Sequence, residues 1–142
     1  MRAGTENIYG IVGFAKAFEI AMAVYENDSA YIGTLKYYMH EKLLKNIPGV
    51  GFNGDVLGKS LYTVLSVSFP KTERSEMILF NLDINKICAS GGSACTSGAE
   101  AGSHVIRAIN NNPNQITVRF SFSKHNTKSE IDAVVEKLKE LV

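Results

Sequence analysis

Both cysteines of the chain lie in one short stretch, CASGGSACTSG, at residues 88–98. Cys95 is surrounded by glycine, serine, threonine and alanine, which cannot pack a hydrophobic core and which leave the backbone free to adopt many conformations. An accessible thiol on such a stretch can ionise, and the thiolate is the nucleophilic form of cysteine. Cys95 is therefore a candidate nucleophile, with a plain loop cysteine and a metal ligand as the alternatives.

Cys88 has a different setting, because Ile87 and Ala89 flank it at the end of an apolar segment. This pattern predicts a buried cysteine that acts as a small hydrophobic residue. Cys88, Cys95 and His104 do not have zinc-type spacing, so we expect no metal site. The glycines of the stretch are not followed by a lysine, which argues against a phosphate-binding P-loop.

Arg119 is the second candidate, in the alternating segment ITVRFSF at residues 116–122. It shares one face with Thr117 and Ser121, opposite a face of apolar side chains. Two interpretations remain open from the spacing alone. The face is exposed to solvent, or Arg119 points into a cleft where its planar guanidinium holds a carboxylate by two hydrogen bonds.

Thr5 and Asn7 precede the first expected helix. Both residue types cap helices well, and capping is the simpler interpretation. The alternative is that they hold an anion at the helix N-terminus, where backbone N–H groups point outward.

The composition limits the class of protein. The chain has 142 residues, of which 45% are hydrophobic and 20% charged, with a net charge of +1. This indicates one folded domain, residues 1–142, and gives no global field that would select nucleic acid or an anionic membrane as a partner. We found no uninterrupted apolar run of about 18 residues and no signal peptide. Two cysteines are too few for a disulfide scaffold, so we expect free thiols and a cytoplasmic location.

Helical periodicity is strongest at both ends of the chain. Apolar residues at spacings of three and four predict a helix over 8–26, a break at the polar residues 27–29 and a second helix to about residue 46. Thr127 and Glu130 form a capping box before a final helix.

The middle of the chain reads as strands and short helices. We expect a turn at 47–55, strands at 61–69, 86–90 and 116–122, a helix at 102–110, and either a helix or a buried strand at 75–85. Strands that alternate with helices in one small domain predict an α+β or α/β fold, with a few-stranded sheet that carries helices on one face.

Several motifs occur together in the order of one known family. They are RAGTEN, GIVGFAKA, NGD, LSVSFP, SGGSACTSG, SHVIRAI and VRFSFSKHNTKSEID. The chain resembles the C-terminal portion of a cysteine desulfurase, a pyridoxal-phosphate enzyme of the class V aminotransferases that supplies sulfur for iron–sulfur cluster assembly. The form SACTSG resembles the branch with a long catalytic loop. The resemblance implies the small C-terminal domain of a fold-type I pyridoxal-phosphate enzyme.

The resemblance also implies roles for three residues. Cys95 stands at the position of the nucleophile that takes sulfur from L-cysteine as a persulfide and passes it to a scaffold or other acceptor protein. Arg119 stands at the position that binds the substrate carboxylate. Thr5 stands where a threonine reaches the cofactor phosphate of the neighbouring subunit in a homodimer.

Two departures from the family qualify these expectations. Residues 100–102 read Glu-Ala-Gly where members often have Leu-Glu-Pro, which removes a proline near the cysteine stretch. The Ser-x-His-Lys type sequence that carries the cofactor lysine does not occur in these 142 residues. The resemblance therefore implies a small domain without its large cofactor domain, inactive by itself. A sulfur-carrier or interaction module, and a related transferase such as a selenocysteine lyase, are the competing interpretations.

Overall fold

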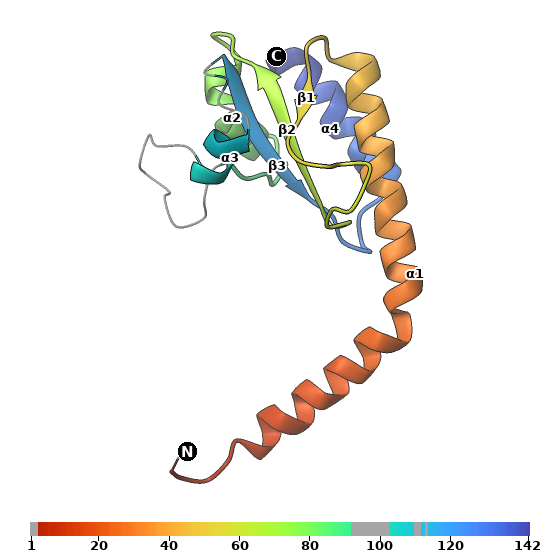
Figure 1. Ribbon diagram of the computed structural model, residues 1–142. Coiled ribbons are helices and arrows are strands. Elements are labelled where there is room, and N and C mark those ends of the chain that lie inside the picture. Colours follow the sequence, from red (N-terminus) through yellow and green to blue (C-terminus); the bar gives the residue numbers. More distant parts are fainter. Residues whose placement is uncertain (1–2, 92–102, 110–111, 113) are drawn as a thin grey trace.

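The centre of the molecule is a three-stranded antiparallel sheet (Figure 1). The computed structural model describes residues 3–91, 103–109, 112 and 114–142. The strands are β1 (Gly51–Phe52), β2 (Val64–Pro70) and β3 (Gln115–Ser121), in the order β1-β2-β3. The register places Val67 opposite Val118 and Ser66 opposite Arg119, so that apolar and polar side chains lie on opposite faces.

Helices cover the apolar face of this sheet. They are α1 (Ile8–Asn46), α2 (Ile78–Ile84), which follows a 3₁₀ turn at Ser75–Met77, and α4 (Lys128–Leu141); a short helix, α3 (His104–Ile109), has no buried residue. The C-terminal half of α1 packs against α4 and β2, and α2 packs against α4. The predicted α+β fold with helices on one face of a small sheet is confirmed.

The core lies between the sheet and these helices, and its members are large aliphatic and aromatic side chains. The most deeply buried are Leu35, Leu43, Leu65, Val67, Phe69, Leu82, Val118 and Leu138, each with an exposed fraction of 0%. Alternate residues of β2 and β3 enter this core, as the period of two in the sequence predicted.

The predicted break at residues 27–29 is wrong, because α1 runs through it as one curved helix (Figure 1). The polar side chains at this point are satisfied on the helix surface. Ser29 Oγ donates to the carbonyl of Glu26 (3.1 Å), and Asp28 pairs with Lys124 (3.1 Å). A serine whose hydroxyl donates to a carbonyl of its own helix can lie in the middle of that helix and does not have to begin a new one.

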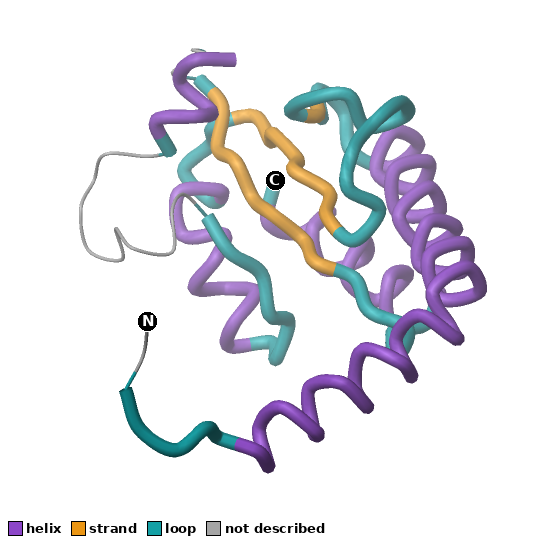
Figure 2. Tube along the Cα trace, turned by 60° about the horizontal axis from the view of Figure 1, so that its bottom comes forward, coloured by secondary structure: helices purple, strands orange, loops and turns teal. Residues whose placement is uncertain are grey.

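The N-terminal half of α1 extends away from the sheet, as Figure 2 shows. Its large apolar side chains are exposed: Ile8, Tyr9, Ile11, Val12, Phe14, Phe18, Ile20, Met22 and Tyr25. An 18-residue stretch of α1 has a mean hydropathy of 1.4 with none of it buried, enough by length and composition to cross a membrane. From the sequence we predicted no apolar segment long enough for this. The same helix continues into the protein core, where Leu35, Met39 and Leu43 are buried.

Two polar contacts fix α1 to its surroundings. The Lys36 side chain is buried and donates to Ser60 Oγ (2.7 Å) and to the Leu61 carbonyl (3.0 Å), and burial lowers the pKa of its amine. Asp132 of α4 accepts from Tyr38 Oη (2.9 Å) and pairs with Lys42 (2.8 Å). The first contact ties the segment before β2 to α1, and the second ties α4 to it.

The other secondary-structure predictions were confirmed in part. Residues 75–84 are helical, which settles the open choice between helix and strand, and the capping box before α4 is confirmed. The predicted strand at 86–90 is reduced to a single bridge, Ser90 with Arg119. The predicted turn at 47–55 contains β1, which the many glycines there had hidden.

The capping box at α4 should make part of the stability depend on pH. The Thr127 N–H donates to Glu130 Oε2 (2.7 Å), and this bond lowers the pKa of Glu130. The contribution of this bond to the free energy of unfolding is therefore complete above the pKa of the carboxyl group in the unfolded chain, about 4.3. It is lost as the pH falls through the lower pKa of the folded chain. We expect Glu130→Gln to lower the melting temperature at pH 7 but not at pH 2.5, measured by circular dichroism on the full chain. An equal difference at both pH values would contradict this.

Candidate functional site

Arg119 lies on the polar face of the sheet, away from the helices. Its neighbours in β3, Val118 and Phe120, are buried on the opposite face, and the pleat of the strand therefore turns Arg119 outward, where it is exposed. Across the sheet it stands opposite Ser66 of β2. The sequence predicted this face correctly.

Ser90 holds Arg119 through three hydrogen bonds. The Arg119 N–H donates to the Ser90 carbonyl (2.7 Å), and the Ser90 N–H donates to the Arg119 carbonyl (3.1 Å). The third bond joins the side chains, from Arg119 Nε to Ser90 Oγ (3.1 Å). Among the described residues no carboxylate pairs with the Arg119 guanidinium. A fixed cation without a counter-ion is suited to bind an anionic group.

Asn53 extends the polar face beside Arg119. It is 9% exposed, and its Nδ2 lies 3.2 Å from Ser66 Oγ and 3.4 Å from Thr117 Oγ1. Its backbone N–H donates to the Ser66 carbonyl (3.0 Å). We call Asn53, Ser66, Ser90, Thr117 and Arg119 the polar sheet face.

Cys95 lies outside the described residues. The last described residues before it are Ser90 and Gly91. A Cβ atom added to Gly91 would lie 2.6 Å from Leu79 Cδ1 and 3.4 Å from the Thr117 carbonyl oxygen, so that the chain passes close to β3 here. Cys95 follows Ser90 by five residues in the chain.

Thr5 is exposed in the segment before α1, at the opposite end of that helix from the sheet (Figure 1). The described chain therefore does not bring Thr5 and Arg119 together. Asn7 is the N-cap, since its side chain accepts from the Gly10 N–H (3.1 Å). The capping interpretation holds for Asn7, and Thr5 is left available for another contact.

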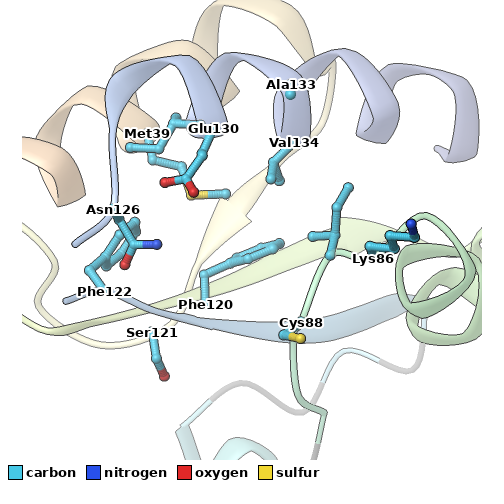
Figure 3. Close-up of a pocket in the computed structure, with 12 residues that line it drawn as sticks. Met39, Lys86, Cys88, Phe120, Ser121, Phe122, Asn126, Glu130, Ala133 and Val134 are labelled. Carbon is cyan, nitrogen blue, oxygen red and sulfur yellow. The ribbon is translucent and has the colours of Figure 1, made fainter.

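The prediction that Cys88 is buried is wrong, because Cys88 is exposed. Figure 3 shows it beside β3 at the edge of a groove of about 400 Å³. Apolar side chains line this groove on the side of the core, and its polar side chains include Lys86, Asn126 and Glu130. Neither Arg119 nor Thr5 is among its lining residues. The strand that would have buried Cys88 is only the single bridge at Ser90.

The described residues hold no cluster of three His, Cys, Asp or Glu side chains that could bind a metal. Two residues of the polar sheet face, Ser90 and Asn53, were not predicted as site residues from the sequence. The segment around Ser90 was expected to be a strand, but only its register against β3 shows that the hydroxyl reaches Arg119. Asn53 lay in the segment interpreted as a turn.

The chain was compared with known proteins. Residues 1–134 match the aminotransferase class-V family. The chain is 39% identical over 143 aligned residues to a cysteine desulfurase of Trichormus azollae and 40% identical over 143 to one of Klebsiella pneumoniae, and each alignment covers 99% of this chain and 35% of the relative. It therefore spans about a third of the length of the curated relatives it matches.

Solved structures of similar fold agree. A NifS-like protein from Rickettsia africae ESF-5 superposes with a TM-score of 0.70 at 25% identity, over 99% of this chain and 36% of that one. A second NifS-like protein gives a TM-score of 0.74 at 29% identity, over 98% and 34%.

Proposed function

The chain belongs to the aminotransferase class-V family, and we propose that it is the small C-terminal domain of a cysteine desulfurase with a long catalytic loop. In this proposal the complete enzyme is a cytoplasmic homodimer that converts L-cysteine to L-alanine and passes the sulfur to an iron–sulfur scaffold or another acceptor protein. The observation that carries the proposal is Arg119: an exposed guanidinium without a carboxylate partner among the described residues, bonded to Ser90 at the base of the cysteine stretch.

Arg119 binds the carboxylate of the substrate. Two parallel N–H donors of a guanidinium match the two oxygens of a carboxylate and fix its orientation as well as its position. A substrate held in this way reacts faster because its orientation is set before the chemical step.

Cys95 is the nucleophile. Its thiolate forms a bond to the sulfur of L-cysteine while the bond between that sulfur and Cβ breaks. The electron pair of the broken bond stays with the carbon fragment, which takes up a proton and leaves as L-alanine. Cys95 then carries the sulfur as a persulfide, and the thiolate of an acceptor protein attacks its outer sulfur and restores Cys95.

Pyridoxal phosphate, when bound, supplies the electron sink that allows the Cβ–S bond to break. The described residues do not form a site for it, because Thr5 and Arg119 lie apart and neither lines the groove. The cofactor lysine has no counterpart motif in these 142 residues. In this proposal the large domain holds the cofactor, and Thr5 binds the cofactor phosphate in the partner subunit of the dimer.

The exposed half of α1 supports the presence of a second domain. A helix with apolar residues around most of its circumference is normally buried, whereas Phe14 is 74% exposed and Phe18 is 59% exposed in this chain. Each such side chain would gain about 1.5–3 kcal/mol from burial. We assign this surface, residues 8–25, to contact with the large domain.

Replacement of Cys95 tests the central role. We expect Cys95→Ser in the complete enzyme to abolish alanine and sulfide production from L-cysteine while cofactor absorbance stays unchanged. Cys88→Ser is the matched control and should keep wild-type activity, because Cys88 is the second cysteine of these 142 residues and lies at the groove, apart from Arg119. Desulfurase activity in the Cys95→Ser variant would disprove the proposal, and acceptance of sulfur from another protein would favour a sulfur-carrier module.

Replacement of Arg119 tests substrate binding. We expect Arg119→Ala to raise the KM for L-cysteine by at least about 10- to 100-fold, because even one charge-assisted hydrogen bond contributes about 1.5–3 kcal/mol. Arg119→Lys should recover only part of this loss, since an ammonium group keeps the charge but not the fork. Steady-state kinetics would measure both variants. An unchanged KM in Arg119→Ala would contradict substrate binding and favour the interpretation that Arg119 lies on a solvent-exposed strand face.

The apolar half of α1 should make the 142-residue chain self-associate. We expect the double variant Phe14→Glu/Phe18→Glu to sediment as a monomer in analytical ultracentrifugation and the wild-type chain to form larger species. Leu57→Glu, at an exposed leucine outside the apolar N-terminal half of α1, is the control and should behave as wild type. Wild-type chain that is monomeric in water, or that moves completely to phospholipid vesicles, would contradict the assignment to a protein domain.

A further inference from the structure

We propose that Ser90 is a positioning residue for Arg119: its hydroxyl accepts the Nε–H and thereby directs the two terminal nitrogens of the guanidinium to the substrate carboxylate. This inference rests on the proposed function, since it concerns how the same site holds its substrate. It is carried by the bond from Arg119 Nε to Ser90 Oγ (3.1 Å) and by the two backbone bonds beneath it.

A guanidinium can meet a carboxylate in two ways. One uses Nε and one terminal nitrogen, and the other uses both terminal nitrogens. In this structure the Nε–H is already donated to Ser90, and no other described group accepts a hydrogen bond from the Arg119 side chain. Only the contact through both terminal nitrogens is therefore left for a carboxylate. A carboxylate bound in this way lies further from β3 than one bound through Nε.

The hydroxyl of Ser90 is itself well held. The reciprocal backbone bonds with Arg119 (2.7 and 3.1 Å) fix the Cα of Ser90 against β3, on the edge that does not pair with β2. The next residue, Gly91, passes too close to Leu79 to accept a side chain without displacement of the leucine. A short side chain on a fixed backbone has little freedom to lose when it forms a hydrogen bond.

Ser90 is also close in sequence to the candidate nucleophile. It is five residues before Cys95 in the chain and is bonded directly to Arg119. The orientation of the Arg119 guanidinium therefore depends on a residue outside β3. A change at Ser90 should act on substrate binding through Arg119, without contact between Ser90 and the substrate.

The first test observes the hydrogen bond in the full 142-residue chain. In ¹⁵N-correlated NMR spectra the Arg119 Nε–H signal is assigned by its loss in Arg119→Lys. We expect slow exchange of this proton with water in the wild type and in Ser90→Thr, which keeps a hydroxyl, and at least tenfold faster exchange in Ser90→Ala. Equal exchange in the wild type and Ser90→Ala would overturn the proposal.

The second test measures the consequence in the complete enzyme. We expect Ser90→Ala to raise the KM for L-cysteine about five- to tenfold with kcat within twofold of the wild type, because ground-state and transition-state binding are lost together. Ser90→Thr should restore KM. Ser121→Ala is the control, since this exposed serine lies two residues further along β3.

The outcomes separate this inference from the function beneath it. A wild-type enzyme that releases no sulfur from L-cysteine overturns the proposed function. An active enzyme in which Arg119→Ala raises KM while Ser90→Ala does not overturns the role of Ser90 alone. A rise of KM in Ser90→Ala that Ser90→Thr does not reverse also overturns it, because the hydroxyl is then not the responsible group.

Discussion

Two backbone hydrogen bonds join the segment after α2 to the outer edge of β3, from Arg119 N–H to the Ser90 carbonyl and from Ser90 N–H to the Arg119 carbonyl. The antiparallel geometry of this bridge brings residues from distant parts of the sequence side by side. Without it Ser90 would have no fixed place beside β3, and the Arg119 guanidinium would have no neutral acceptor for its Nε–H. This bridge holds Ser90 and Arg119 together, whereas Asn53 of the same polar sheet face is held by Ser66 and Thr117.

Much of the architecture could be predicted because burial imposes a simple period. Alternation placed Val118 in the core and Arg119 outside it, and spacings of three and four identified the buried side of the second half of α1. The site was less accessible to such reasoning. Whether Arg119 faces bulk water or a ligand depends on which segment lies beside β3, and the partner, Ser90, is 29 positions away in the sequence. Local patterns do not contain that register.

The errors have local physical causes as well. The polar residues 27–29 do not end the helix, because Ser29 donates to a carbonyl of its own helix and Asp28 pairs with Lys124. Cys88 was expected to be buried because its neighbours are apolar, but the strand that would have covered it ends at a single bridge. Glycine-rich sequence concealed β1, whose two residues are held by pairing with β2 and not by their own strand propensity.

Helix α1 is continuous from Ile8 to Asn46, and its 39 residues correspond to about 58 Å at 1.5 Å per residue. The helix is curved but unbroken, and its C-terminal half is held in place by the core and by Lys36. Its free end therefore magnifies small rotations: a tilt of about 5° at the clamped half moves a point 30 Å away by about 2.6 Å, from the rise per residue over twenty residues. The position of Thr5 therefore depends on how Leu35 and Leu43 pack in the core. A small change in that packing would displace Thr5 at the other end of the helix.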